Sequence, residues 1–200
     1  MGVSLEKMKN PLPVTQEAFC DFVWGNREVL DEMFKEAKEA REEGIEVGVA
    51  ICEEDGALFL GERSKGEKHT LHIEPCRKGN TVGDVHTHTG VGLPEPSLGD
   101  VVGSLHYGRH FNCIISEGLL WSPIVSCYHF KRTPEVKEII RTGEEIEREY
   151  KQVGLTADVE RRLEEFEKLK HDAAPKESAE RACTFSKFLG EEWGRQGKSP

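Results

Sequence analysis

The spacing of apolar residues divides the first two thirds of the chain into one helix followed by short strands. Over residues 26–43 apolar side chains recur every three or four positions, which predicts a helix that Asn26 caps and Gly44 ends. The period then changes, and two short β-branched or apolar runs around a turn at 53–56 predict a β-hairpin over 45–62. Further strands are predicted at about 69–73, 81–88, 111–116 and 124–130. The Gly- and Pro-rich residues 89–96 predict a loop, after which a helix is expected from Ser97 to about Tyr107.

The pattern changes again from residue 131, where charged residues make up nearly half of the sequence and no strand pattern is evident. Thr133 followed by Pro134 predicts the start of a first helix, a second is expected from near Thr156, and a third over about 177–193. We therefore predict three parts. Residues 1–25 form an N-terminal extension with an apolar segment that docks on the core, 26–131 the central domain, and 132–200 a charged helical segment.

Composition and charge narrow the class of protein. The 200 residues suit one domain of ordinary size, and 27 basic against 37 acidic residues give a net charge of −10. This acidic excess argues against binding to nucleic-acid backbones, which requires basic surface. No apolar run approaches the roughly 18 residues of a membrane span, and the first residues lack the apolar stretch of a signal peptide, so a cytoplasmic location is expected.

Six cysteines are present, and none forms a Cys-x-x-Cys pair of the kind found in zinc fingers or thioredoxin-like proteins. The even number leaves disulfides open. The expected reducing location nevertheless favours free thiols, buried as small apolar side chains.

The most informative stretch combines two histidines with a Ser–Asp pair. His86 and His88 are two residues apart in a predicted strand, so their side chains project from the same face. After eight intervening residues, Ser97 and Asp100 have the spacing of a helix-capping box. The loop between the two pairs returns the chain to the strand end, and it can bring Asp100 beside both histidines.

Each pair alone has an ordinary explanation, because an isolated His-x-His is usually incidental and Ser-x-x-Asp usually caps a helix. Together they offer two imidazole nitrogens and one carboxylate, with a fourth position left for water, which is the arrangement of a catalytic zinc site. Zinc lowers the pKa of its bound water to about 7 and so supplies hydroxide at neutral pH. Iron held by two histidines and a carboxylate is the less favoured alternative.

This segment resembles the JAMM motif (also MPN+ or JAB) of zinc metalloproteases, which has an upstream Glu on a strand, then His-x-His, about seven residues, and Ser-x-x-Asp. The order of elements is also similar over about residues 26–131, and the loop end at 93–97 is most like that of prokaryotic members, including RadC-type proteins. The chain departs from the motif twice, with eight residues between His88 and Ser97 and with Thr89 where the family usually has Pro. Both departures concern the loop, which is easily lengthened, rather than the ligands.

The resemblance implies an α+β fold, a curved mixed β-sheet flanked by helices of the cytidine-deaminase-like kind, with additional C-terminal helices. It implies Zn²⁺ held by His86, His88 and Asp100. The family's upstream Glu holds the zinc-bound water and acts as general base and then acid, and Glu46 stands at the matching position. Ser97 matches the serine that helps to stabilise the oxyanion.

Three other glutamates compete with Glu46 for the role of general base. Glu53 and Glu54 fall in a predicted turn and Glu62 at a strand end, whereas Glu46 interrupts a β-branched run. A charged residue in such a run either lies at the exposed start of the strand or faces a site.

The resemblance further implies that the substrate is an amide or isopeptide bond at the C-terminal tail of a ubiquitin-like or sulfur-carrier protein. Such a tail would add as a strand to an exposed sheet edge. The alternative is a catalytically silent scaffold, because many proteins of this fold serve in larger assemblies and the charged C-terminal helices suit a partner or self-association. A RadC-like role near DNA is disfavoured by the acidic balance.

Overall fold

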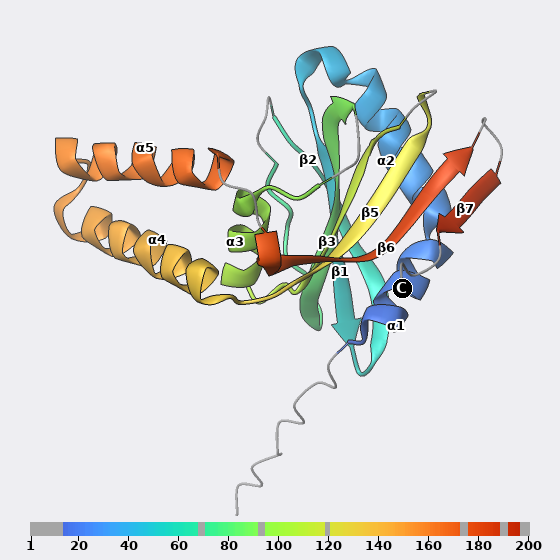
Figure 1. Ribbon diagram of the computed structural model, residues 1–200, viewed down its shortest axis with the longest axis horizontal. Helices are drawn as coiled ribbons and strands as arrows, with labels where there is room; N and C mark the ends of the chain where they lie inside the picture. The colour runs from blue at the N-terminus through green and yellow to red at the C-terminus, as the bar shows by residue number, and fades with distance from the viewer. Residues whose placement is uncertain are drawn as a thin grey trace, which may run out of the picture.

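The computed structural model describes residues 14–67, 71–91, 95–118, 121–172, 176–188 and 192–196. In this part of the chain seven strands form one mixed sheet of order β2-β1-β3-β4-β5-β6-β7, with helices packed against it (Figure 1). The strands are β1 (Val47–Glu54), β2 (Ala57–Lys65), β3 (Asn80–Val91), β4 (Phe111–Glu117), β5 (Pro123–Phe130), β6 (Ala179–Phe188) and β7 (Glu192–Gln196). The helices are α1 (Gln16–Gly25), α2 (Arg27–Glu39), α3 (Leu98–His106), α4 (Pro134–Val153) and α5 (Ala157–Asp172), with short 3₁₀ turns at Arg41–Glu43 and Lys176–Ser178.

Most of the elements expected before residue 170 are confirmed. Helix α2 and the 3₁₀ turn after it end at Gly44, whose φ of 66° is the left-handed conformation that closes a helix. In the β1–β2 hairpin, Asp55 and Gly56 both have positive φ, 52° and 84°, as a tight hairpin turn requires. The strand predicted around 69–73 is not found where it can be checked, because 71–73 are irregular and 68–70 lie outside the described residues.

Helix α3 connects β3 to β4, the one parallel pair among the described strands. This crossover places α3 on one face of the sheet, where it packs against Tyr128 and Phe130 of β5. Helices α1 and α2 cover the other face, where Phe19 of α1 stacks on Phe111 of β4 with ring centroids 4.4 Å apart. The docking predicted for the apolar N-terminal segment is therefore confirmed for α1.

The helix predicted over 177–193 is wrong, because most of this segment forms strands β6 and β7. Strand β6 pairs antiparallel with β5, so that β5 is not left as an open edge. Cys183 and Phe185 alternate with Thr184 and Ser186, and the first two pack into the α1–α2 core. This period of two was hidden by apolar residues that also fall at helical spacing. The segment from 132 to 200 is therefore not helical throughout, and it contributes two strands to the sheet.

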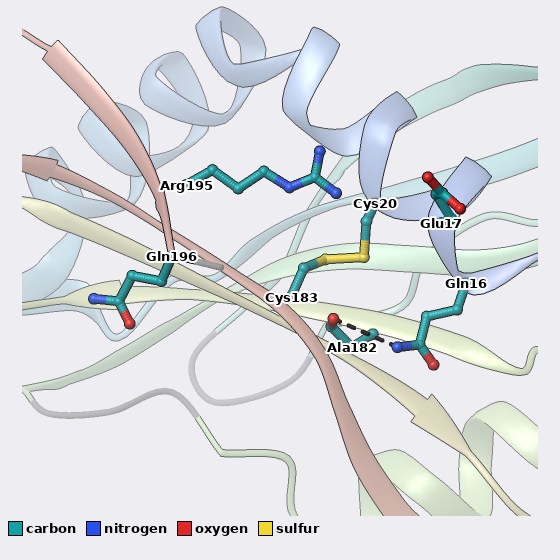
Figure 2. A pocket seen from close by; sticks show the side chains of 7 residues that line it. All are labelled: Gln16, Glu17, Cys20, Ala182, Cys183, Arg195 and Gln196. Atoms are coloured by element: carbon teal, nitrogen blue, oxygen red, sulfur yellow. Dashed lines mark hydrogen bonds between the residues drawn. A yellow bond between two sulfur atoms is a disulfide. The ribbon is translucent and has the colours of Figure 1, made fainter. Parts of the chain in front are cut away.

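The expectation of free thiols is also wrong, because all six cysteines are paired in the structure. The disulfides are Cys20–Cys183, Cys52–Cys76 and Cys113–Cys127. Figure 2 shows the first of them joining α1 to β6 across 163 positions of sequence, in a hollow where the Gln16 amide also donates to the carbonyl of Ala182. The pairing follows from the fold, since Cys113 and Cys127 are direct partners in the β4–β5 register.

Helices α4 and α5 form a hairpin that projects beside α3, away from the sheet (Figure 1). Both helices were predicted, and Thr133 caps the first by accepting a hydrogen bond from the N–H of Val136. Gly143 lets the two helices approach, because a Cβ there would lie 2.9 Å from the ring of Phe166. None of the helices in the described part of the chain has the length and apolar character needed to cross a membrane.

Candidate metal centre

Strand β3 supplies both histidines of the site. Their side chains share a face because they are two residues apart, and Gly83 allows this part of β3 to approach β4 closely, since a Cβ there would lie 2.5 Å from the carbonyl oxygen of Phe111. The β3–β4 register runs from Thr87 opposite Ile115 to Val91 opposite Glu117, so three residues of β3 bulge against one of β4. His88 lies in this bulge. Bulges of this kind commonly re-aim a side chain beside a functional site.

Helix α3 supplies the carboxylate. Ser97 precedes its first turn and forms the predicted capping box with Asp100, whose Oδ2 accepts from the Ser97 N–H at 2.7 Å and from its hydroxyl at 2.9 Å. The other oxygen, Oδ1, lies 3.7 Å from His86 Nε2. The cap therefore engages Oδ2, and Oδ1 is the oxygen that the capping box leaves for a metal ion.

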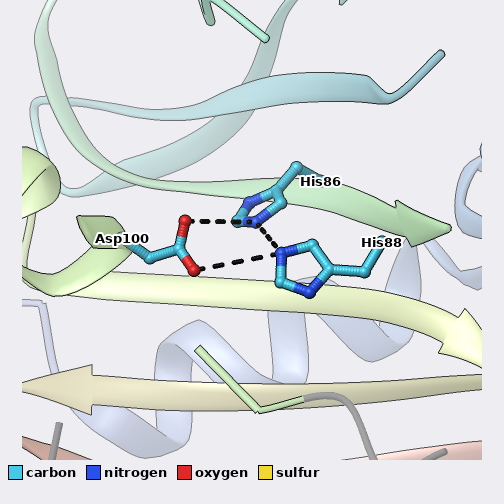
Figure 3. A group of neighbouring side chains, drawn as sticks. All are labelled: His86, His88 and Asp100. Carbon is cyan, nitrogen blue, oxygen red and sulfur yellow. Dashed lines mark hydrogen bonds and ion pairs between the residues drawn. The ribbon is translucent and has the colours of Figure 1, made fainter. Parts of the chain in front are cut away.

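Figure 3 shows the three side chains converging from the strand and the helix. The two Nε2 atoms are 3.0 Å apart. Asp100 Oδ1 lies 3.7 Å from His86 Nε2, and Asp100 Oδ2 lies 3.9 Å from His88 Nε2. Ligands at 2.0–2.1 Å around a tetrahedral ion would be separated by about 3.3–3.4 Å. One donor atom from each residue lies within 4.8 Å of the other two, so the side chains would have to draw together slightly, and the group could hold a metal ion.

Burial is graded across the three side chains. The side chain of His86 is 7% exposed, that of Asp100 is 23% exposed and that of His88 is 30% exposed. A small hollow reaches His88 from the α2 face of the sheet, where Phe34, Ala37 and Thr87 help to line it. The inner ligand is thus enclosed by protein, whereas Asp100 and His88 are partly open to solvent.

Burial and neighbouring charges together shift the pKa values of the two imidazoles in opposite directions. Burial alone would lower the pKa of His86, but the hydrogen bond to Asp84 and the negative charges of Asp100, Asp84 and Glu46 outweigh it and raise this pKa to about 9. Burial and the adjacent positive ring lower the pKa of His88 to about 4. The metal-free pair therefore carries one positive charge at neutral pH, that is, one proton more than two neutral imidazoles. A metal ion bound between the Nε2 atoms would replace that proton.

Glu46 lies immediately before β1, on the strand next to the histidines. The antiparallel pairing of β1 with β3 reaches its last pair at Gly48 opposite His86, and Glu46 precedes Gly48 by two residues. It is half-buried, its backbone carbonyl accepts from the N–H of Gly66, and its charge contributes to the raised pKa of His86. Glu46 therefore lies at the histidine end of β1, and its role as general base stays a prediction.

The structure places the competing glutamates elsewhere. Glu53 is buried at the other end of β1, where it accepts hydrogen bonds from the N–H of Gly56 and the amide of Asn80. Glu54 is exposed at the same end of β1. That end is at least six strand residues, or about 20 Å, from the histidines. Glu62 pairs with Arg77 at the surface. Of these four glutamates, Glu46 is the one at the histidine end of β1, and its charge contributes to the raised pKa of His86.

Ser97 reaches the site only through Asp100. Its hydroxyl donates to Asp100 Oδ2 and accepts from the Asp100 N–H at 3.1 Å. A serine hydroxyl has one proton to donate, so this one is committed to the cap. An oxyanion contact from Ser97 would require the hydroxyl to turn away from Asp100, and that role stays a prediction.

The sequence interpretation missed Asp84 and Asn112. Asp84 Oδ1 lies 3.0 Å from His86 Nδ1, and Asn112 Nδ2 donates to the same oxygen at 2.7 Å. The signal for Asp84 was present, because it precedes the two histidines at the same two-residue spacing and so shares their face. Asn112 is brought opposite Asp84 by the parallel pairing of β3 with β4, which local sequence does not reveal.

No family model, curated protein or solved structure matches this chain. The resemblance to the JAMM motif therefore stays a prediction that rests on the residues themselves.

Proposed function

We propose that the protein is a zinc-dependent metallopeptidase or isopeptidase. The observation that supports it is the convergence of His86, His88 and Asp100, with Glu46 at the start of the facing strand. Two imidazoles and one carboxylate are a donor set that suits zinc and leaves a coordination position for water. A closed structural site would have four protein ligands instead.

In this proposal His86, His88 and Asp100 hold the ion, which when bound lowers the pKa of a water molecule and polarises the scissile carbonyl. The Glu46 carboxylate accepts a proton from the attacking water as its oxygen bonds to the carbonyl carbon. Glu46 then passes this proton to the leaving nitrogen as the carbon–nitrogen bond breaks, so that it ends the cycle as a carboxylate. The substrate would be an amide or isopeptide bond at the C-terminal tail of a ubiquitin-like or sulfur-carrier protein.

Glu46→Gln tests the role of Glu46 in this mechanism. The amide cannot take up a proton, so the variant should bind zinc as the wild type does while hydrolysis falls about 10²- to 10⁴-fold. The measurement is release of a fluorophore joined by an amide bond to the C-terminus of a ubiquitin-like protein, with zinc content determined in parallel. Glu54→Gln is the matched control, since it makes the same change at the exposed far end of β1. Full activity in Glu46→Gln would show that the base has been misassigned.

The scaffold alternative is supported by a different part of the molecule. Near the turn between α4 and α5, Tyr150, Val153 and Leu155 are 49%, 57% and 62% exposed. Adjacent exposed apolar side chains are typical of protein-interaction sites. If the zinc-loaded wild type hydrolyses none of the tail substrates, the scaffold becomes the leading hypothesis.

A further inference from the structure

Asp84 is a buried carboxylate in direct contact with a proposed metal ligand. It precedes His86 by two residues on β3, and only 3% of it is exposed. An ionised carboxylate is costly to bury without hydrogen-bonding partners. Asp84 has two, which are the His86 ring and the Asn112 amide, and the Arg109 guanidinium lies 3.8 Å from its Oδ2 as an ion-pair partner.

The direction of each hydrogen bond follows from the chemistry of the groups. An ionised carboxylate can only accept, so Nδ1 of His86 carries a proton and donates it to Asp84 Oδ1. Asn112 points its NH₂ group at the same oxygen, because the opposite orientation of the amide would bring two oxygens to 2.7 Å. With Nδ1 engaged in this way, Nε2 is the ring atom directed at His88 and Asp100.

We propose that Asp84 is a positioning residue for the metal centre. It fixes the ring orientation of His86 and keeps the proton on Nδ1, so that the Nε2 lone pair is available to the ion. Asn112 in turn holds the carboxylate from the neighbouring strand. The proposal rests on the proposed function, because it needs the three side chains to bind metal. Carboxylate partners of this kind typically strengthen metal binding by 10- to 100-fold.

A purely structural role for Asp84 would also destabilise the fold on mutation, so the deciding measurement is metal affinity. Zinc affinity is determined by competition with a chromophoric chelator for the wild type, Asp84→Asn and Asp84→Ala. The melting temperature of each metal-free protein is measured alongside. We expect Asp84→Ala to bind zinc about 10- to 100-fold more weakly. Asp84→Asn keeps an acceptor but loses the charge, and its affinity should lie between those of Asp84→Ala and the wild type.

Glu53→Gln is the matched control. Glu53 is also a strand carboxylate, 4% exposed, that accepts hydrogen bonds from a backbone N–H and an asparagine amide. Its substitution should lower the melting temperature without changing zinc affinity, since it lies at the far end of β1.

A second measurement keeps the proposal testable if Asp84→Ala folds poorly. In the metal-free protein, a ring proton held between His86 Nδ1 and a carboxylate should appear as a slowly exchanging, downfield nitrogen-bound proton in the NMR spectrum. It should weaken in Asp84→Asn. Undiminished zinc affinity in both Asp84 variants, or a wild-type spectrum without this proton, would overturn the role of Asp84 alone. Failure of the wild type to bind zinc would overturn the metal site itself.

Discussion

The two faces of the central strands differ in kind although they are built from adjacent residues. On the face covered by α1 and α2, Val85, Cys113 and Cys127 belong to an apolar core that contains two disulfides. On the face covered by α3, the preceding residues Asp84 and Asn112 form a buried hydrogen-bonded network with the first histidine. Strands β3 and β4 thus contribute to the apolar core on one side and to the candidate metal centre on the other, because their side chains alternate.

The face on which a substitution lies should therefore decide whether it changes the stability of the fold or the binding of metal. Changes on the α1–α2 face should lower the free energy of unfolding and leave the metal site intact in the molecules that remain folded. Substitutions among the ligands should weaken metal binding and leave the free energy of unfolding nearly unchanged.

The largest effect is expected for His88→Ala. It removes one of three ligands, and we expect zinc affinity to fall at least about 10³-fold, which is about 4 kcal/mol. The side chain is 30% exposed, so the unfolding free energy of the metal-free protein should hardly change. Isothermal titration with zinc and denaturant unfolding measure the two quantities. A large loss of stability in the metal-free variant would show that the ligand face also supports the fold.

The second largest effect is expected for the stability of the core on the α1–α2 face. Replacing Cys20 and Cys183 together by Ala removes the covalent link between α1 and β6. Loss of a disulfide that closes so long a loop typically costs about 2–5 kcal/mol of stability. Denaturant unfolding under oxidising conditions tests this. Zinc affinity should be the same as in the wild type, and a parallel loss of zinc binding would show that the two faces are coupled.

Thr87→Val gives the smallest effect and the sharpest comparison, since Thr87 lies between the two histidines but faces the other way. Its hydroxyl accepts from the buried N–H of Val47 at 2.9 Å. Valine has the same shape without the acceptor, so we expect a loss of about 1–3 kcal/mol in unfolding free energy and no change in zinc affinity. Thr87→Ser, which keeps the hydroxyl, is the control. Equal stability of the two variants would show that this hydrogen bond contributes nothing.

Local pattern was enough to predict most of the elements around the site. Strand β3, the Ser97 cap and helix α3 follow from periodicity and capping chemistry, and these elements bring His86, His88 and Asp100 together. Glu46 could be placed at a strand start, but its position at the histidine end of β1 depends on the pairing of β1 with β3.

What the sequence could not show depends on contacts between distant segments. Strands β6 and β7 form because β5 offers a free edge, which no local pattern records. The Cys20–Cys183 pair depends on α1 docking against β6. The partner of Asp84 likewise comes from a strand 28 positions away, at Asn112. In each case tertiary pairing decided between alternatives that the local sequence left open.

Metal content per chain would show whether the α3 face holds a single zinc ion. Mass spectrometry would measure bound metal per chain in the wild type and in Asp100→Ala, both purified without a metal-binding tag. The account predicts about one zinc per wild-type chain and little in the variant. Absence of zinc from both proteins, even after zinc is supplied, would contradict it and leave a capping box beside two incidental histidines.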